Sequence, residues 1–431
     1  MDTGRNKQLE LLEKARRYLP GATLGNIRFD SEHALVATKG MGSKVWDVAG
    51  NEYIDYVMGS GPMILGHAHP SVTAAVREAV QDGSHFFVTN ESAILLAEEL
   101  VKAVPCADKV RFTTSGTDAN FQAMRIARAF RKRDKILKFE GGFHGTSDYA
   151  MMSVAPTTIK DFPQPSPSTA GIPESVQKTM MSAPFNDLET TTAIVDKYHD
   201  ELAAVIVEPL QRIIPPTPDF LKGLRDVTTY HQIPLIFDEV VTGFRLAYGG
   251  AQEKYGVVPD LAALGKIIGG GYPLAAVCGR EEIMDAYEPK YEGTKSHVQQ
   301  VGTLNGMPIA CRAGLATLSE LRKEGTYQKV DTTGRKLRES LDSLLREAEI
   351  PGQTYGDNSL FDVYFTDKPI INYRSTKSAD TKLLNKFNTL LLDQGILKGL
   401  PQKIYPSTAH TDEDVKKTIE AFEVAVNHLS G

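Results

Sequence analysis

Between about residue 70 and residue 310, short apolar runs with strand character alternate with longer stretches of helical periodicity. Such alternation needs crossover connections, which join parallel strands into a sheet covered by helices on both faces. Strands are expected at KVRFTTS, KILKFEGG, AAVIVEP, PLIFDEV and AAVCG. We therefore predict an α/β fold centred on one large, mainly parallel sheet.

The flanking regions follow a different pattern. Residues 6–19 carry leucines at helical spacing, and KVWDVAGNEYIDYV alternates like a hairpin with its turn at AGN. After residue 310 come two helical stretches, the strand-like SLFDVYFT and a last helix from about Thr411 to Leu429. Residues 151–186 have little periodicity, which favours a lid over a disordered loop. The predicted parts are an N-terminal segment 1–69 that joins the small domain, a large domain 70–310 and a small α+β domain 311–431.

The composition excludes several kinds of partner. A net charge of −6 over 431 residues and a pI near 6.0 disfavour nucleic acid or an anionic membrane. The widely spaced Cys106, Cys278 and Cys311 argue against a disulfide framework and a clustered metal site. No apolar run approaches the ~18 residues of a membrane span, and the charged N-terminus lacks the apolar core of a signal peptide. We expect a cytoplasmic protein without a metal.

Two of the apolar runs lead into residues that carry chemistry. Asp238 ends the run PLIF, whereas Lys266 follows the run LAAL and precedes GGG at 269–271. Open α/β sheets bind ligands at the carboxyl ends of their strands. A carboxylate that keeps a ring nitrogen protonated and an amine that forms a Schiff base are what pyridoxal phosphate (PLP) requires. Taken alone, either residue is explained as well by a capping acid or a surface lysine, but together they predict a catalytic centre.

The segment RFTTSGTDA, residues 111–119, runs from a strand into a helix and offers a phosphate site. Backbone N–H groups at a helix N-terminus attract anions, so Gly116 and Thr117, preceded by Ser115, are candidates to hold a phosphate. The alternative is a simple N-cap by Ser115 or Thr117. No GxGxxG follows a strand, and HExxH and CxxC motifs are absent from the sequence. Lys266 is followed by Ile267 and has no glycine five residues before it, so a P-loop is excluded as well.

Two further strand ends carry candidate cofactor contacts. Phe143 and His144 lie in EGGFHG, where the phenylalanine is placed to stack on a pyridine ring and the histidine to donate a hydrogen bond behind it. The alternative is a core phenylalanine and a histidine satisfied within a turn. Glu208 closes AAVIVEP and either bonds near the cofactor or caps the next segment.

Taken in order, the motifs SGTDA, EGGFHG, VEP, DEV, LGK with GGG, and GTLNG at 302–306 resemble those of the class-III aminotransferases of PLP fold type I. The segments YIDYVMGSGPMILGHAHP, GIPESVQKTMMSAPFND and STAHTDEDV are similar to those of the glutamate-1-semialdehyde 2,1-aminomutase branch. The resemblance covers nearly the whole chain. It implies a large domain with a mainly parallel sheet of the seven-stranded type and a smaller α+β domain built from the N- and C-terminal segments.

The same resemblance implies roles for the site residues. Lys266 would bind PLP as a Schiff base and later move the proton, while Asp238 pairs with the pyridinium nitrogen. Phe143 and Val240 would clamp the two ring faces, and Thr303 would reach the phosphate of the neighbouring subunit, which implies a homodimer with shared sites. The implied cofactor contacts are Ser115, Gly116, Thr117, Phe143, His144, Glu208, Asp238, Val240, Lys266 and Thr303.

Four positions bear on the substrate. Arg28 matches the family's arginine for the substrate carboxylate, a role that suits a planar bidentate donor. The aminomutase branch has a tryptophan where this chain has Ser60, a tyrosine where it has Gln299 and a glutamate where it has Gln402. A pocket that loses a large aromatic and an acid is larger and less negative, so these departures predict altered specificity.

We therefore predict a homodimeric PLP-dependent aminotransferase that acts on a carboxylate-bearing amine, such as a β- or ω-amino acid, and a keto acid or aldehyde. The first alternative is glutamate-1-semialdehyde 2,1-aminomutase itself. A second, from another class, is a non-catalytic binding protein with the PLP fold. A decarboxylase or racemase also stays open, because the cofactor supplies the electron sink and the protein selects which bond breaks.

Overall fold

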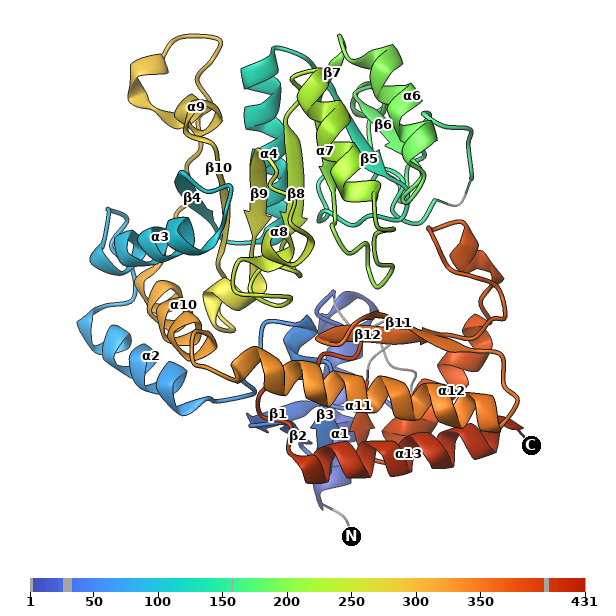
Figure 1. The fold of residues 1–431 in the computed structure, drawn as a ribbon. Helices are drawn as coiled ribbons and strands as arrows, with labels where there is room; N and C mark the ends of the chain where they lie inside the picture. Colours follow the sequence, from blue (N-terminus) through green and yellow to red (C-terminus); the bar gives the residue numbers. More distant parts are fainter. Residues whose placement is uncertain (1–2, 26–32, 157, 399–402, 431) are drawn as a thin grey trace. The chain divides into compact units, whose positions relative to one another are not determined.

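The computed structural model describes residues 3–25, 33–156, 158–398 and 403–430 (Figure 1). The chain divides into two compact units, which are described separately. The larger comprises Ser71–Lys323 and Ile370–Lys377, and the smaller comprises Met1–Pro70, Glu324–Pro369 and Ser378–Gly431. In the larger unit, α10 (Pro308–Leu321) packs against α3 (Glu91–Ala103) and the turn η3 (Lys266–Gly269), and so the unit continues beyond residue 310. The division at residues 69 and 310 remains a proposal about domains.

A seven-stranded sheet forms the centre of the larger unit and confirms the predicted fold class. Five neighbouring strands, from β9 (Leu261–Leu264) through β8, β7 and β5 to β6 (Met180–Ala183), are parallel, whereas β10 (Ala275–Gly279) is antiparallel to both of its neighbours. The strand β6 lies inside the segment 151–186 and was not expected, because its sequence MMSA has neither alternation nor β-branched residues. In spatial order the strands are β4 (Lys109–Thr113), β10 (Ala275–Gly279), β9 (Leu261–Leu264), β8 (Leu235–Glu239), β7 (Leu202–Val207), β5 (Lys135–Phe139) and β6 (Met180–Ala183).

Helices cover both faces of this sheet (Figure 1). On one face, α4 (Gly116–Arg131) packs on five of the strands, and its buried alanines let it approach them closely. On the other face lie α6 (Leu188–Tyr198) and α7 (Phe220–Tyr230), which pack together. Because the sheet is covered on both sides, β7 is buried at every position and reads LAAVIV. The unit also contains α2 (Pro70–Asp82), α5 (Glu174–Gln177), α8 (Gly250–Tyr255) and α9 (Glu281–Met284).

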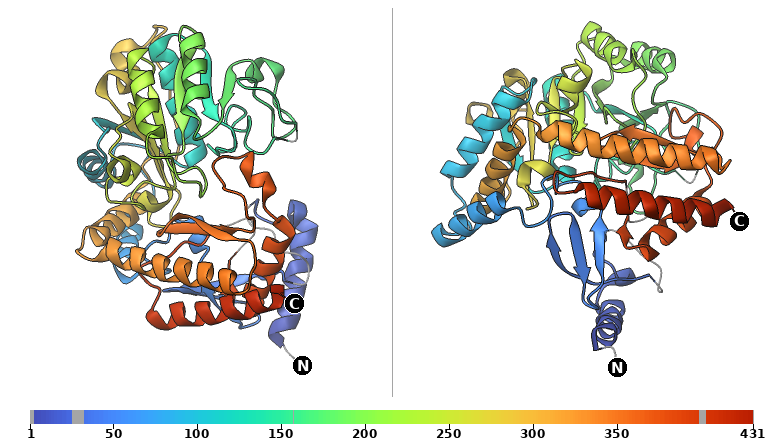
Figure 2. Two further views of the ribbon diagram at one scale, coloured as in Figure 1. Left: turned by 45° about the vertical axis from the view of Figure 1, so that its right-hand side comes forward. Right: turned by 60° about the horizontal axis from the view of Figure 1, so that its bottom comes forward.

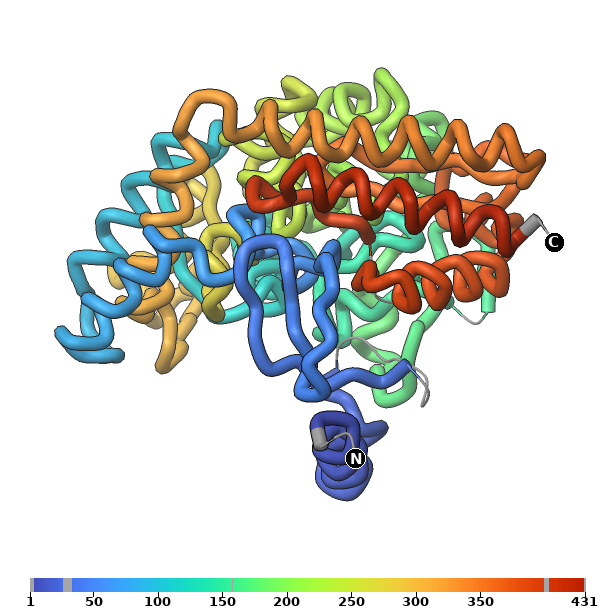
Figure 3. The backbone as a smooth tube through the Cα atoms, turned by 90° about the horizontal axis from the view of Figure 1, so that it is seen from below, coloured from blue at the N-terminus to red at the C-terminus, as the bar shows by residue number. Residues whose placement is uncertain are grey.

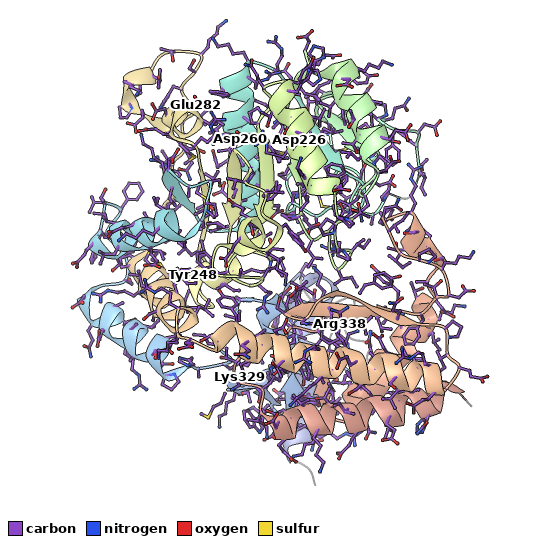
Figure 4. The ribbon with its side chains drawn as sticks, viewed as in Figure 1. Asp226, Tyr248, Asp260, Glu282, Lys329 and Arg338 are labelled. Atoms are coloured by element: carbon purple, nitrogen blue, oxygen red, sulfur yellow. The ribbon has the colours of Figure 1, made fainter. Side chains whose placement is uncertain are left out.

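A cluster of ion pairs lies at the amino ends of the central strands β8 and β9. Asp260, labelled in Figure 4, precedes β9 and accepts hydrogen bonds from Arg225 Nη1 and Arg280 Nη1, each at 2.7 Å. Its carboxylate also accepts from the backbone N–H of Leu235 at 2.8 Å, at the start of β8. Because these charges are mutually satisfied, the cluster fixes the start of two strands whose far ends carry Asp238 and Lys266.

The smaller unit has its own core. The predicted hairpin is present as β2 (Lys44–Asp47) and β3 (Glu52–Asp55). The helices α11 (Thr326–Glu347) and α13 (Asp412–Ser430) run side by side (Figure 2), and α12 (Thr381–Asp393) packs on α13. Figure 3 shows α1 nearly end-on beside the sheet strands. Within the part of the chain that the structure describes, no helix is both long and apolar enough to cross a membrane. The remaining elements are α1 (Thr3–Tyr18), β1 (Ala37–Met41), β11 (Gln353–Asp357), β12 (Leu360–Tyr364) and β13 (Ile396–Leu397).

Candidate active site

The carboxylate of Asp238 is held on β8 with only 5% of the residue exposed. Asn120 Nδ2 and His144 Nδ1 each lie 2.8 Å from its Oδ2, and the backbone N–H of Val240 donates to Oδ1 at 3.1 Å. Because an ionised carboxylate only accepts, His144 carries its proton on Nδ1 in this contact. His144 Nε2 is buried and has no hydrogen-bond partner among the described residues. An oriented acid thus stands at the carboxyl end of a central strand.

Lys266 follows β9 at the same edge of the sheet. It begins the turn η3 with a φ of 50°, a left-handed conformation that costs a non-glycine residue on the order of 1 kcal/mol. Burial lowers the pKa of the Lys266 ammonium, while the charges of Asp238 and Glu208 act in the opposite direction. A desolvated amine loses its proton more readily and is a better nucleophile at neutral pH.

The sequence left open whether the N-terminus of α4 is a simple N-cap or a phosphate site, and its geometry allows both. Ser115 is the N-cap, since its Oγ accepts from the N–H of Asp118 at 3.2 Å and its carbonyl accepts from Ala119 at 3.0 Å. Gly116 and Thr117 precede that first intrahelical hydrogen bond, so their N–H groups face the end of the helix. A Cβ at Gly116 would lie 2.7 Å from Cγ1 of Val240, and glycine therefore permits the close packing of Val240 on the helix start.

The loop EGGFHG is tied down around Phe143. The N–H of Phe143 donates to Glu208 Oε2 at 2.9 Å, which gives the buried Glu208 a specific partner. Gly145 has a φ of 95°, and a Cβ there would overlap Thr117. Thr117 Oγ1 in turn accepts from the N–H of Thr146 at 3.2 Å. The Phe143 residue itself remains 38% exposed, so its ring is available to a ligand.

Sequence reasoning missed two residues that support this site. Asn120, one turn into α4, holds Asp238 as described above. Lys138 on β5 is fully buried, and its Nζ donates to the carbonyls of Gly142, Ala150 and Met152. Burial lowers the pKa of Lys138 to about 7. The available signal was a lysine inside the apolar run KILKF, where a charged side chain must find partners.

Of the predicted substrate residues, the structure describes Ser60 and Gln299. Gln299 is exposed and borders a surface hollow of about 510 Å³, and the exposed Thr303 lines another of about 530 Å³. Ser60 is half-buried in the smaller unit, in the turn η2 (Met58–Ser60). Arg28 and Gln402 lie outside the described residues. The site brought together within this chain is therefore that of the predicted cofactor contacts, with Thr303 apart from it.

These residues fit PLP. Asp238 presents acceptor oxygens for a protonated ring nitrogen, Lys266 supplies a desolvated amine for covalent attachment, and the first turn of α4 offers backbone N–H groups for a phosphate. The partly exposed Phe143 offers a ring on which a planar group could stack. Lys266 would hold its reactive carbon, Asp238, positioned by His144 and Asn120, its ring nitrogen, and Gly116 and Thr117 its phosphate.

Comparison with known proteins agrees with the geometry. The family model "Aminotransferase class-III" matches residues 28–426. A glutamate-1-semialdehyde 2,1-aminomutase of Brevibacillus brevis is 40% identical to the chain, with 97% of each sequence covered. An ω-transaminase from Sphaerobacter thermophilus has a similar structure, with a TM-score of 0.93, 35% identity and 98% of each chain covered. A β-phenylalanine aminotransferase from Variovorax paradoxus reaches a TM-score of 0.87 at 29% identity, covering 99% of this chain and 94% of its own.

Proposed function

Since the chain belongs to the class-III aminotransferases, which are PLP-dependent enzymes, we propose that it transfers an amino group between a carboxylate-bearing amine and a keto acid or aldehyde. The amine is of the β- or ω-amino acid type. The observation that carries the proposal is the pairing of the desolvated Lys266 amine with the oriented carboxylate of Asp238 at one edge of the sheet.

Each side chain has a defined task in this reaction. PLP, when bound, supplies an electron sink for the carbon that bears the amino group. Lys266 would be the attachment point; once the substrate amine has displaced it, its free amine would act as base and then as acid in a 1,3-proton shift, taking the proton from that carbon and returning it two atoms away. Asp238 keeps the ring nitrogen protonated, and Asn120 and His144 hold Asp238 in place. Glu208 accepts from the backbone N–H of Phe143 and so fixes the residue that would cover one face of the ring.

Three positions favour an aminotransferase over an aminomutase. In the aminomutase branch that the chain resembles, these positions shape the substrate pocket. Ser60, Gln299 and Gln402 replace a tryptophan, a tyrosine and a glutamate. The likeness to an ω-transaminase is consistent with this choice, whereas the curated relatives named aminomutases support the alternative.

A two-part assay separates these functions. We expect β- and ω-amino acids to convert the bound cofactor to its amine form, seen as loss of its visible absorbance, and a keto acid to restore it. Glutamate-1-semialdehyde alone should yield 5-aminolevulinate at less than about one hundredth of that rate. Rapid formation of 5-aminolevulinate would establish the aminomutase, and spectral inertness towards every donor would leave a PLP-binding protein.

We also propose that the enzyme is a cytoplasmic homodimer whose copies share their active sites. An exposed apolar patch surrounds the cavity that contains Thr303, and contiguous patches of this kind mark interfaces. The occupant that fits is a second copy, because Thr303 would then bind the phosphate in the neighbouring subunit's site. The patch comprises Phe86, Phe87, Val88, Ile94 and Val301.

The three cysteines are free and buried, as a reducing compartment allows.

The substitution Val88→Asp tests this interface. Val88 is 71% exposed, so an aspartate costs the single chain little, whereas burying that charge in an interface costs several kcal/mol. We expect the dimer dissociation constant to rise by about 100-fold or more, and turnover to fall with it, in sedimentation velocity and activity assays over a dilution series. Wild-type particles should have twice the chain mass of 47.2 kDa. Tyr230→Asp, at an 82% exposed position outside the patch, is the control; equal behaviour of the two variants would contradict the interface.

A further inference from the structure

A tight turn beside the active site carries an arginine in an unfavourable conformation. Gln211 and Ile214 pair through two backbone hydrogen bonds, of 3.0 and 2.8 Å, so that Arg212 and Ile213 form a two-residue turn. Arg212 is its first central residue and has a φ of 63°. Turns of this kind favour glycine there, because a Cβ strains the left-handed backbone. Strain of this sort is typical of functional sites.

The side chain of Arg212 forms few stabilising contacts with the other described residues. It is half-buried, and its guanidinium lies 5.4 Å from the centroid of the Phe143 ring. Among the described residues, no carboxylate or carbonyl lies within hydrogen-bond or ion-pair range of it. By contrast, Arg131 donates to four carbonyls and Arg225 to Asp260, Thr229 and Val258. A half-buried guanidinium with five unused donors is a site for an anion.

The anion site lies close to the reacting amine. Phe143 precedes His144, whose Nδ1 lies 2.8 Å from Oδ2 of Asp238, and the N–H of Phe143 donates to Glu208, four residues before Arg212. The positive charge of Arg212 also acts on Lys266, where it contributes to lowering the pKa of the ammonium. An anion bound at Arg212 would therefore belong to a molecule that also reaches Lys266.

We propose that Arg212 binds a carboxylate of the substrate and thereby selects a dicarboxylic donor or acceptor. The inference rests on the proposed function, in which the substrate already bears one carboxylate, and Arg212 would bind a second. A planar fork matches a carboxylate through two parallel hydrogen bonds. Arg212 is thus a specificity-determining residue that the sequence motifs do not reveal.

Glutarate and pentanoate test the proposal, because they have equal chain length and differ by one terminal carboxylate. Binding to the PLP-loaded enzyme is measured by calorimetry and by the shift in the visible spectrum, without turnover. We expect the wild type to bind glutarate about 10- to 100-fold more tightly than pentanoate, as charge-assisted hydrogen bonds predict. In Arg212→Gly that preference should vanish, and in Arg212→Lys it should be intermediate.

The glycine variant suits the strained turn, so its thermal unfolding midpoint and its affinity for PLP should equal those of the wild type. Lys132→Gly is the matched control: it also removes a cation from a left-handed position, with a φ of 55° at the C-cap of α4. An unchanged glutarate preference in Arg212→Gly overturns the proposal, as does an equal loss in Lys132→Gly or a parallel loss of PLP affinity. Failure of all amine donors, with the glutarate preference intact, would instead reject the proposed reaction and leave the carboxylate site standing.

Discussion

Replacing Lys266 with alanine is expected to lower the rate of amino transfer by about 10⁴-fold or more. The substitution removes both the attachment point for PLP and the amine that moves the proton, and no other lysine in the described part of the chain is placed to take over both tasks. Lys138, the other lysine whose pKa is lowered beside the site, is fully buried and engaged with three carbonyls.

The measurement combines single-turnover spectroscopy with steady-state kinetics. The variant should lack the visible absorbance of covalently attached PLP but still bind PLP through Asp238 and the N-terminus of α4. Lys254→Ala, at an exposed position on α8, is the control and should retain wild-type turnover. Retention of more than about a tenth of the wild-type rate by Lys266→Ala would remove Lys266 from the centre of the mechanism.

The sheet and its functional edge were predictable because local sequence patterns specify them. A buried parallel strand reads as an unbroken apolar run, and the first polar residue after it marks the carboxyl end. This logic placed Asp238 and Lys266 correctly at the ends of β8 and β9. The strand β6 escaped the same logic, because four residues with the sequence MMSA carry no strand-specific signal.

The supporting residues could not be predicted, because their roles depend on contacts between distant parts of the chain. Asn120 lies 118 positions from Asp238 in the sequence, and nothing in the helix around it distinguishes it from a surface amide. Arg212 reads as an ordinary loop arginine until its left-handed backbone and lack of partners among the described residues are known. The role of Ser115 could be predicted only in part, because an N-cap and a phosphate site at a helix start have the same sequence signature.

The packing of α10 beneath Lys266 leads to the second large expected effect. Gly314 on α10 faces η3, and a Cβ there would overlap the carbonyl oxygen of Ile268, two residues after Lys266. On an unhindered helix, Gly→Ala stabilises by up to about 1 kcal/mol. For Gly314→Ala we expect the opposite sign, with a loss of about 1–3 kcal/mol in the free energy of unfolding, because the overlap is with backbone. Turnover should fall at least tenfold, since relieving the overlap displaces the turn that carries Lys266.

Gly334→Ala in the smaller unit provides a matched control. Gly334 also lies within a helix, α11, and a Cβ there would overlap the carbonyl oxygen of Asn358. Arg338, one turn further along α11 and labelled in Figure 4, donates to the carbonyl of Gly356 at 3.3 Å and to Asn358 Oδ1 at 3.1 Å, which holds that carbonyl close. Urea unfolding should show a similar loss of stability for both variants, while only Gly314→Ala changes the absorbance of bound PLP and the turnover per folded molecule. If the two variants alter the cofactor spectrum equally, the turn η3 does not transmit the strain to Lys266, and the contact between α10 and η3 has a purely structural role.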